Sequence, residues 1–292
     1  MQFKYGFGKG YKEFSIDDKN IIMELHQNKV KIDLTEREEV RRALEHPIGS
    51  KKLRDIVKPG EKIVIITSDI TRPMPSKDVL PLVLEELVSA GVAYDDITVV
   101  FALGSHRKHT EEEKKYLVGE EVYNKVRCID SDPDDCVRMG MTKSGTPVDI
   151  FSVVANADRR ICLGNIEFHY FAGYSGGAKA IMPGVSTRAA IQATHSGMVK
   201  SGARAGAIDD NPVRLDIEEV ADFVPIDFIV NVVLDEKKNI IKAVAGHHVH
   251  AHREGCRFLD TLYKVEIPQQ ADIVVTTPGG YPKDINLYQA QK

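Results

Sequence analysis

Residues 62–110, KIVIITSDITRPMPSKDVLPLVLEELVSAGVAYDDITVVFALGSHRKHT, decide the fold because they alternate strand, helix and strand patterns. The runs 62–67 and 96–102 are short, apolar and rich in β-branched residues, as is typical of strands buried on both faces. Between them, apolar residues recur with helical spacing, namely at Val79, Leu80, Val83, Leu84 and Leu87. Thr110 and Glu113 form a capping-box pattern that predicts the start of another helix. This alternation indicates a mostly parallel sheet covered by helices.

The rest of the chain extends the same pattern. Further strands are predicted at 146–157, 159–164, 227–235 and 239–246, and helices at 35–46, 186–199, 212–222 and 250–263. The fold class that we expect is therefore α/β, with mostly parallel sheets flanked by helices.

The last stretch, ADIVVTTPGGYPKDINLYQAQK (271–292), reads as a buried strand, a glycine turn and the first turns of a helix. A new strand–helix unit without neighbours suggests that a second α/β domain begins here and is largely missing. We therefore expect an N-terminal cofactor-binding and catalytic domain over 1–265, and the start of a truncated second domain over 266–292.

Composition excludes several classes of protein. Apolar residues make up 42% and charged residues 28% of the 292 residues, close to the average of globular proteins. The net charge of −4, without a basic block, argues against nucleic acid as the main partner. No apolar run approaches a membrane span or a signal peptide. The four cysteines lack disulfide or zinc spacing. A cytoplasmic protein is the expectation.

Four loops with polar or charged residues directly follow predicted strands, where ligands bind in parallel α/β sheets. They cover 67–75, 103–110, 169–186 and 277–284. In the first, Asp69 and Thr71 stand beside Arg72, whose guanidinium suits a phosphate or a carboxylate. The alternative for this loop is a structural Asp–Arg pair that closes the turn before Pro73.

The second loop places His106 at a strand end, where an imidazole can exchange a proton near neutral pH. Its structural alternative is that Ser105 or Thr110 caps the next helix and that the basic residues are solvated. We favour a functional role for His106 and a structural one for His109.

The third loop, HYFAGYSGGAKAIMPGVS, has glycines at 173, 176 and 177 that permit a nest of backbone N–H groups for an anion. Lys179 follows as a point charge or amine nucleophile. It is not a Walker A loop. His169 and His195 bracket it, which makes a purely structural role for both histidines harder to accept.

For two other motifs, a role in metal or dinucleotide binding is the weaker interpretation. His248 and His252, within GHHVHAHRE (246–254), have the i, i+4 spacing of metal ligands, but a solvated helix start is the better interpretation. The glycines of YGFGKG (5–10) follow no predicted strand, so a dinucleotide-binding fingerprint is improbable.

The combination of these loops resembles the lactate racemase family, whose enzymes use a nickel-pincer nucleotide. The segments that carry the resemblance are DITRPMP, GSH, GMTKSGTPV, HYFAGYSGGAKAIMPG and GGYPKDINLYQAQK. The resemblance covers essentially the whole chain. It implies a covalent cofactor, pyridinium-3,5-bisthiocarboxylic acid mononucleotide, whose sulfur donors hold nickel. Members continue well past the point where this sequence stops.

The resemblance also implies a role for each matching residue. Lys179 matches the lysine that bonds the cofactor, His195 the nickel ligand, and His106 and His169 the acid–base pair. Groups around the cofactor would be Asp69, Thr71, Arg72, Gly176 and Gly177. Substrate would be bound by Arg72, Tyr288, Gln289 and Lys292.

The implied reaction is racemisation or epimerisation of a small 2-hydroxy acid, above all lactate, by hydride transfer. Hydride can return to either face of the flat keto acid, and each face needs its own base for the hydroxyl proton. Cofactor-synthesis enzymes would be transient partners. Two rivals stay open: a related dehydrogenase or lyase, and a cofactor-binding fragment without turnover.

Overall fold

The computed structural model describes residues 1–281 and 284, and the chain divides into two compact units. The larger unit is Lys31–Leu259, and the smaller one combines Met1–Val30 with Asp260–Lys292. The predicted domain boundary between residues 265 and 266 concerns the domains of the family and stays a prediction.

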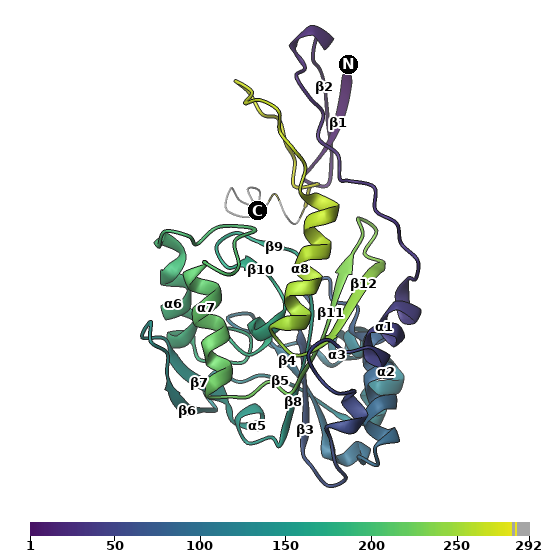
Figure 1. Ribbon diagram of the computed structural model, residues 1–292, viewed down its shortest axis with the longest axis vertical. Helices are drawn as coiled ribbons and strands as arrows, with labels where there is room; N and C mark the ends of the chain where they lie inside the picture. Colours follow the sequence, from purple (N-terminus) through teal and green to yellow (C-terminus); the bar gives the residue numbers. More distant parts are fainter. Residues whose placement is uncertain (282–283, 285–292) are drawn as a thin grey trace. The chain divides into compact units, whose positions relative to one another are not determined.

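A six-stranded sheet forms the centre of the larger unit, in the order β12-β11-β8-β3-β4-β5 (Figure 1). All neighbours pair in parallel except β11 and β12, which are antiparallel. The mostly parallel sheet predicted from the sequence is thus confirmed. The strands are β3 (Ile63–Ser68), β4 (Ile97–Ala102), β5 (Arg127–Asp130), β8 (Arg159–Asn165), β11 (Phe228–Leu234) and β12 (Ile240–Gly246).

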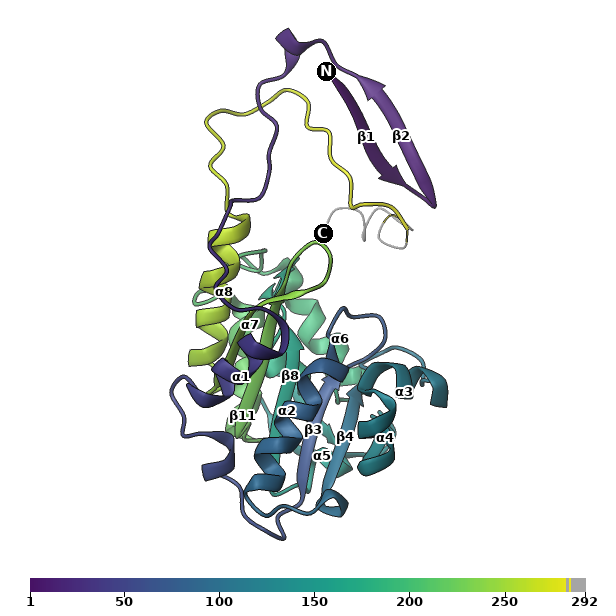
Figure 2. The same cartoon turned by 90° about the vertical axis from the view of Figure 1, so that its right-hand side faces the viewer.

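Helices cover both faces of this sheet (Figures 1 and 2). One face packs on α1 (Glu36–Glu45), α2 (Ser76–Ser89), α3 (Glu111–Val118) and α4 (Glu120–Lys125) in a single core. The other side carries α5 (Ser152–Ala155), α6 (Arg188–Ser196), α7 (Pro212–Glu219) and the first half of α8 (His250–Tyr263). The capping box at Thr110 and Glu113 opens α3 as predicted.

Short elements complete the larger unit. The hairpin of β6 (Cys136–Met141) and β7 (Pro147–Phe151) and the small pair of β9 (Phe168–His169) and β10 (Gly173–Tyr174) are antiparallel. The 3₁₀ turns are η2 (Leu53–Asp55), η3 (Tyr94–Asp96), η4 (Gly177–Ala180), η5 (Gly197–Val199) and η6 (Val220–Asp222).

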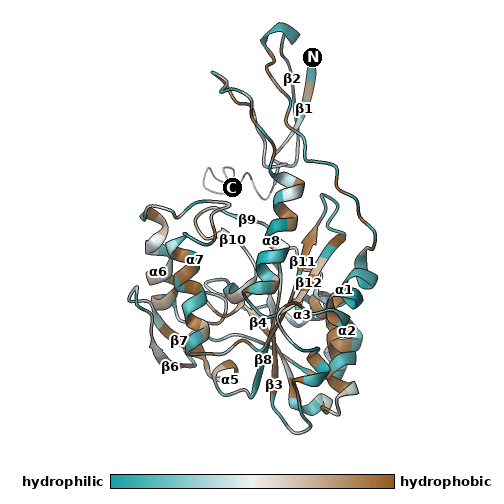
Figure 3. Cartoon of the chain, viewed as in Figure 1, coloured by the Kyte–Doolittle hydropathy of each residue, from teal (hydrophilic) through white to brown (hydrophobic). Residues whose placement is uncertain are grey.

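The central strands are apolar on both sides because both of their faces are covered. Every residue of β11 is buried, and Ile63–Ile66 of β3 are buried without interruption. Figure 3 shows the hydrophobic colour concentrated on these strands. Such runs identify parallel strands of an α/β fold. Among the described residues, no helix combines the length and the hydropathy needed to cross a membrane.

Two predictions from the sequence are wrong in the smaller unit. YGFGKG was expected to follow no strand, but β1 (Gln2–Phe7) and β2 (Gly10–Ser15) form an antiparallel hairpin, and Gly8, at φ +56°, lies in its turn. The glycines serve a hairpin, which leaves the motif unlike a dinucleotide loop. This unit also contains the 3₁₀ turn η1 (Asp18–Asn20).

The strand predicted within 271–276 is the second correction, because the structure has no strand there. Ile273 is 80% and Val274 is 76% exposed. An apolar run becomes a strand only when a neighbour accepts its hydrogen bonds, and within the described part of the chain no strand pairs with it. Most of the predicted helix start lies outside the described residues.

Candidate functional site

A cavity of about 190 Å³ lies in the larger unit, at the carboxyl ends of β3, β4 and β8. Three of the loops singled out in the sequence meet there, as expected for a parallel α/β sheet. Its wall includes Asp69, Arg72, His106, His169, Lys179 and His195. Asp69 and Arg72, far from Lys179 and His195 in the sequence, thus line the same cavity.

Asp69 and His106 form a hydrogen-bonded pair in this wall. The Nδ1 of His106 lies 2.8 Å from Oδ2 of Asp69, and the Thr71 hydroxyl donates to Oδ1 over 2.9 Å. Burial alone raises the pKa of the Asp69 carboxyl, but the hydrogen bond and charge of His106, with Thr71 and Arg72, hold it below its usual value. An ionised Asp69 accepts only, so Nδ1 of His106 carries the proton. Nε2 of a neutral His106 is then available as a base.

Asp69 and Arg72 do not form the structural pair that was the alternative for the first loop. The partners of the Asp69 carboxylate are His106 and Thr71, while Arg72 is exposed at the cavity and donates its backbone N–H to the carbonyl oxygen of Asp69 over 3.1 Å. The structural Asp–Arg pair is therefore not what closes the turn. Thr71 supports Asp69 and is not itself part of the cavity wall.

The glycine loop is shaped by close contacts. Gly173, Gly176 and Gly177 have φ values of +75°, +76° and +61°. A Cβ on Gly173 would lie 1.8 Å from the carbonyl oxygen of Ala207, and one on Gly176 would lie 2.7 Å from Oδ1 of Asn231. Only glycine fits these positions.

The predicted nest of N–H groups is smaller than the sequence suggested. The N–H of Gly177 donates to Oδ1 of the buried Asn231 over 2.7 Å, so it is not available to a phosphate. Gly176 contributes to the cavity wall, and Gly177 does not. Lys179 follows in η4, half-buried and in the wall.

A buried arginine that holds this loop was missed in the sequence analysis. Arg214 of α7 is wholly buried, and its guanidinium donates to the carbonyl oxygens of Ala172, Tyr174 and Gly176. Burial lowers the pKa of Arg214 to about 10, so it stays protonated at neutral pH. The available signal was its place three positions before the core residue Ile217, because an arginine on the buried face of a helix needs partners.

The two histidines that bracket the loop have opposite hydrogen-bonding arrangements. Nδ1 of His169 accepts from the N–H of Ala172 over 3.2 Å, whereas Nδ1 of His195 donates to the carbonyl oxygen of Ile191 over 2.7 Å. Both rings pack edge-on against Phe171. A neutral His195 therefore keeps its lone pair on Nε2. This is the state in which a histidine binds a metal.

The histidines of GHHVHAHRE differ in their surroundings. Within the described residues, no group of three His, Cys, Asp or Glu side chains is arranged to hold an ion. The prediction of a solvated helix start is wrong for His252, which is fully buried and whose Nε2 lies 2.7 Å from the carbonyl oxygen of Ser175. Burial holds the pKa of His252 well below its usual value.

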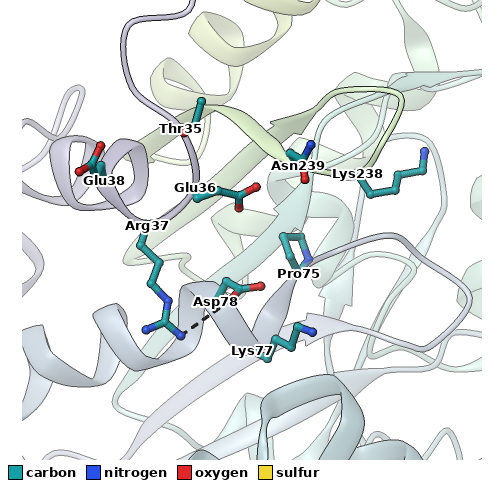
Figure 4. A pocket seen from close by; sticks show the side chains of 9 residues that line it. All are labelled: Thr35, Glu36, Arg37, Glu38, Pro75, Lys77, Asp78, Lys238 and Asn239. Atoms are coloured by element: carbon teal, nitrogen blue, oxygen red, sulfur yellow. Dashed lines mark ion pairs between the residues drawn. The ribbon is translucent and has the colours of Figure 1, made fainter.

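A second, larger hollow of about 610 Å³ lies between the starts of α1 and α2 (Figure 4). Its wall mixes carboxylates with lysines and one ion pair, Arg37 with Asp78 at 3.7 Å. None of its side chains is a histidine, a cysteine or a serine. The smaller cavity therefore remains the candidate site.

The comparisons with known proteins bear on this cavity. Residues 7–206 match the family model of the lactate racemase N-terminal domain, a range that contains all six wall residues named above. The curated lactate racemase of Thermoanaerobacterium thermosaccharolyticum is 38% identical over 98% of this chain and 68% of its own length. That of Lactiplantibacillus plantarum is 40% identical over 95% of this chain and 66% of its own. The chain thus spans about two thirds of these relatives.

Solved structures agree. The lactate racemase apoprotein of T. thermosaccharolyticum superposes with a TM-score of 0.87 at 36% identity, over 99% of this chain and 69% of that one. A protein from Thermotoga maritima shares the fold, with a TM-score of 0.64 at 19% identity over 77% of this chain and 59% of that one. Tyr288, Gln289 and Lys292, the other predicted site residues, lie outside the described residues. By its family-model match and its relatives, the chain belongs to the lactate racemase family.

Proposed function

We propose that this chain is the cofactor-binding part of a lactate racemase, an enzyme that interconverts the two enantiomers of lactate. The observation that carries the proposal is the meeting of His106, His169, Lys179 and His195 in one cavity of about 190 Å³. This volume is below the about 300–1,000 Å³ of sites that enclose drug-sized ligands. It suits a small hydroxy acid beside the reactive end of a larger cofactor.

The residues present fit the nickel-pincer nucleotide that the family resemblance implies. His195 offers Nε2 as a metal ligand because Nδ1 is occupied by Ile191. Lys179 offers the amine for the covalent link. When bound, the cofactor would supply an acceptor and donor for the hydride of the substrate α-carbon.

The protein's own residues would handle the proton and the orientation. Nε2 of His106, whose Nδ1 is held by Asp69, would take the hydroxyl proton on one face of the substrate. His169 would serve the other face, with the roles exchanged in the reverse direction. Arg72 would bind the substrate carboxylate, together with Tyr288, Gln289 and Lys292.

Peptide mapping of the chain produced alongside cofactor-synthesis enzymes, its proposed transient partners in the cytoplasm, tests the covalent link. We expect added mass, including sulfur, on the peptide that contains Lys179. Lys179→Ala should abolish the adduct, while Lys143→Ala, at a side chain that is 90% exposed, should keep it. An adduct that persists in Lys179→Ala would refute the assignment.

Chiral analysis of the product separates the rivals. A racemase converts each lactate enantiomer into a mixture, a dehydrogenase accumulates the keto acid, and a cofactor-binding fragment carries the adduct without turnover. Loss of racemisation in both His106→Ala and His169→Ala is expected. Parental turnover by either variant would contradict the two-base mechanism.

A further inference from the structure

His109 lies behind the cavity rather than in its wall. Its side chain is only 1% exposed and packs edge-on against Phe101 of β4, with ring centroids 5.1 Å apart. Its Nδ1 lies 2.6 Å from Oδ1 of Asp130, whose other oxygen accepts the backbone N–H of His109 over 3.0 Å. Asp130, at the end of β5, thus holds both the ring and the backbone of this residue.

The other ring nitrogen of His109 contacts the loop that carries Asp69. Nε2 accepts the backbone N–H of Ile70 over 3.1 Å. An N–H donor requires a lone pair on Nε2, so the ring is neutral and its proton is on Nδ1, toward Asp130. Other charged groups near this pair are Lys114, with Nζ 3.9 Å from Oδ2 of Asp130, Glu113, which interacts with His109, and Lys108, which interacts with Asp130.

Ile70 directly follows Asp69, whose carboxylate holds His106 at 2.8 Å and whose carbonyl oxygen accepts the N–H of Arg72. Through its hydrogen bond to the Ile70 N–H, the buried His109–Asp130 pair therefore fixes the backbone of the turn that carries Asp69. We propose that His109 is a positioning residue that sets the Asp69–His106 pair through the Ile70 N–H. The catalytic consequence rests on the proposed function, whereas the positioning itself does not.

Two isosteric substitutions separate positioning from mere packing. In His109→Gln, the amide oxygen replaces Nε2 as the acceptor for the Ile70 N–H. In His109→Asn, the amide nitrogen replaces Nδ1 as the donor to Asp130, but the shorter side chain leaves the Ile70 N–H without an acceptor. Asp130→Asn is a second route to the same loss. Its amide can donate to Nδ1, which moves the ring proton to Nε2 and turns it against the Ile70 N–H.

The test is nuclear magnetic resonance on the cofactor-free chain, read at the His106 ring and the Ile70 amide. His109→Asn and Asp130→Asn should shift or lose the downfield Nδ1 proton signal of His106. They should also accelerate Ile70 amide exchange by about fivefold or more, the factor expected from losing one hydrogen bond. His109→Gln should stay close to the parent on both readouts. If the Gln and Asn variants behave alike, or if neither changes the His106 signal, the positioning role is wrong.

Turnover of the cofactor-loaded enzyme adds an independent readout. A displaced catalytic pair should lower kcat by up to about 100-fold, with a smaller change in KM, in the Asn variant and not in the Gln variant. Failure of the proposed function would leave every variant without racemisation but would not alter the resonance result. Failure of the positioning proposal would leave racemisation intact and the His106 signal unchanged.

Discussion

Replacing Arg214 by methionine should loosen the glycine loop that carries Lys179. Methionine has a similar length and fills the space of the buried side chain, but it cannot donate to the carbonyl oxygens of Ala172, Tyr174 and Gly176. The helix α7 keeps its cap, because Oδ1 of Asn211 accepts from the N–H groups of Val213 and Arg214 through backbone atoms. The loss is therefore confined to the loop.

The loss of stability expected for Arg214→Met follows from these hydrogen bonds. A buried acceptor left without a donor costs about 1–3 kcal/mol, and the contact to Gly176, at 3.4 Å and only partly buried, contributes least. Glu218, 3.9 Å from the guanidinium, keeps Arg253 as a partner and is not left unpaired. Because two buried carbonyl oxygens, those of Ala172 and Tyr174, lose their donor, we expect a loss of about 4 kcal/mol. A domain stable by about 5–15 kcal/mol would still fold.

Arg160 offers a matched control. It is also buried, and it donates to the carbonyl oxygens of Val154, Ala155 and Ala157 at 2.7–2.8 Å. Urea unfolding should show comparable losses for Arg160→Met and Arg214→Met. Amide exchange across 173–180 should accelerate only in Arg214→Met. Equal acceleration in both variants, or a loss below about 1 kcal/mol for Arg214→Met, the centre of the distribution for point mutations, would refute the reasoning.

Two further predictions concern stability. Gly173→Ala should cost more than the about 1–3 kcal/mol of a left-handed backbone alone, because its Cβ would lie 1.8 Å from the carbonyl oxygen of Ala207. Gly60→Ala, at φ +82° with nothing within 4 Å of its Cβ, should show only the backbone strain in urea unfolding; equal losses would contradict this. Second, stability should fall as pH drops below about 6.5, the pKa of an unperturbed histidine. Burial lowers the pKa of His252 well below that value and that of His248 to about 4, so the unfolded chain binds protons that the fold does not. The slope should approach about 1.4 kcal/mol per pH unit for each histidine, and urea unfolding that is unchanged between pH 7 and 5 would exclude it.

The sequence predicted the central strands and the covering helices well because local patterns determine them. The apolar run at 63–66 and the helical spacing in 76–89 need no knowledge of distant residues. The convergence of His106 and His169 followed from one topological rule, since the ends of parallel strands meet at one edge. The tautomers of His169 and His195 did not follow, because they depend on single backbone groups of Ala172 and Ile191.

Prediction failed where a distant partner decides the structure. The run at 271–276 has the composition of a strand, but no described strand pairs with it. His252 reads as a helix-start histidine, but the carbonyl oxygen of Ser175, 77 positions away, determines its place. Arg214 breaks the apolar face of its helix, and only the fold supplies the carbonyl oxygens that compensate.

These buried donors also change what the glycines of the loop mean. From composition alone, three glycines suggest a pliable segment that lets Lys179 move. The structure gives them a steric purpose, since the space for a Cβ at Gly173 and Gly176 is already filled by Ala207 and Asn231. Arg214 and His252 then hold the carbonyl oxygens of the same segment, and Asn231 holds its N–H at Gly177.

The glycines allow a backbone conformation with positive φ and close contacts that other residues could not adopt. The hydrogen bonds from Arg214, Asn231 and His252 stabilise this conformation. A loop fixed in this way presents Lys179 at a defined place in the cavity wall. Ordering its backbone on cofactor binding would then cost little entropy, because that cost has been met in folding.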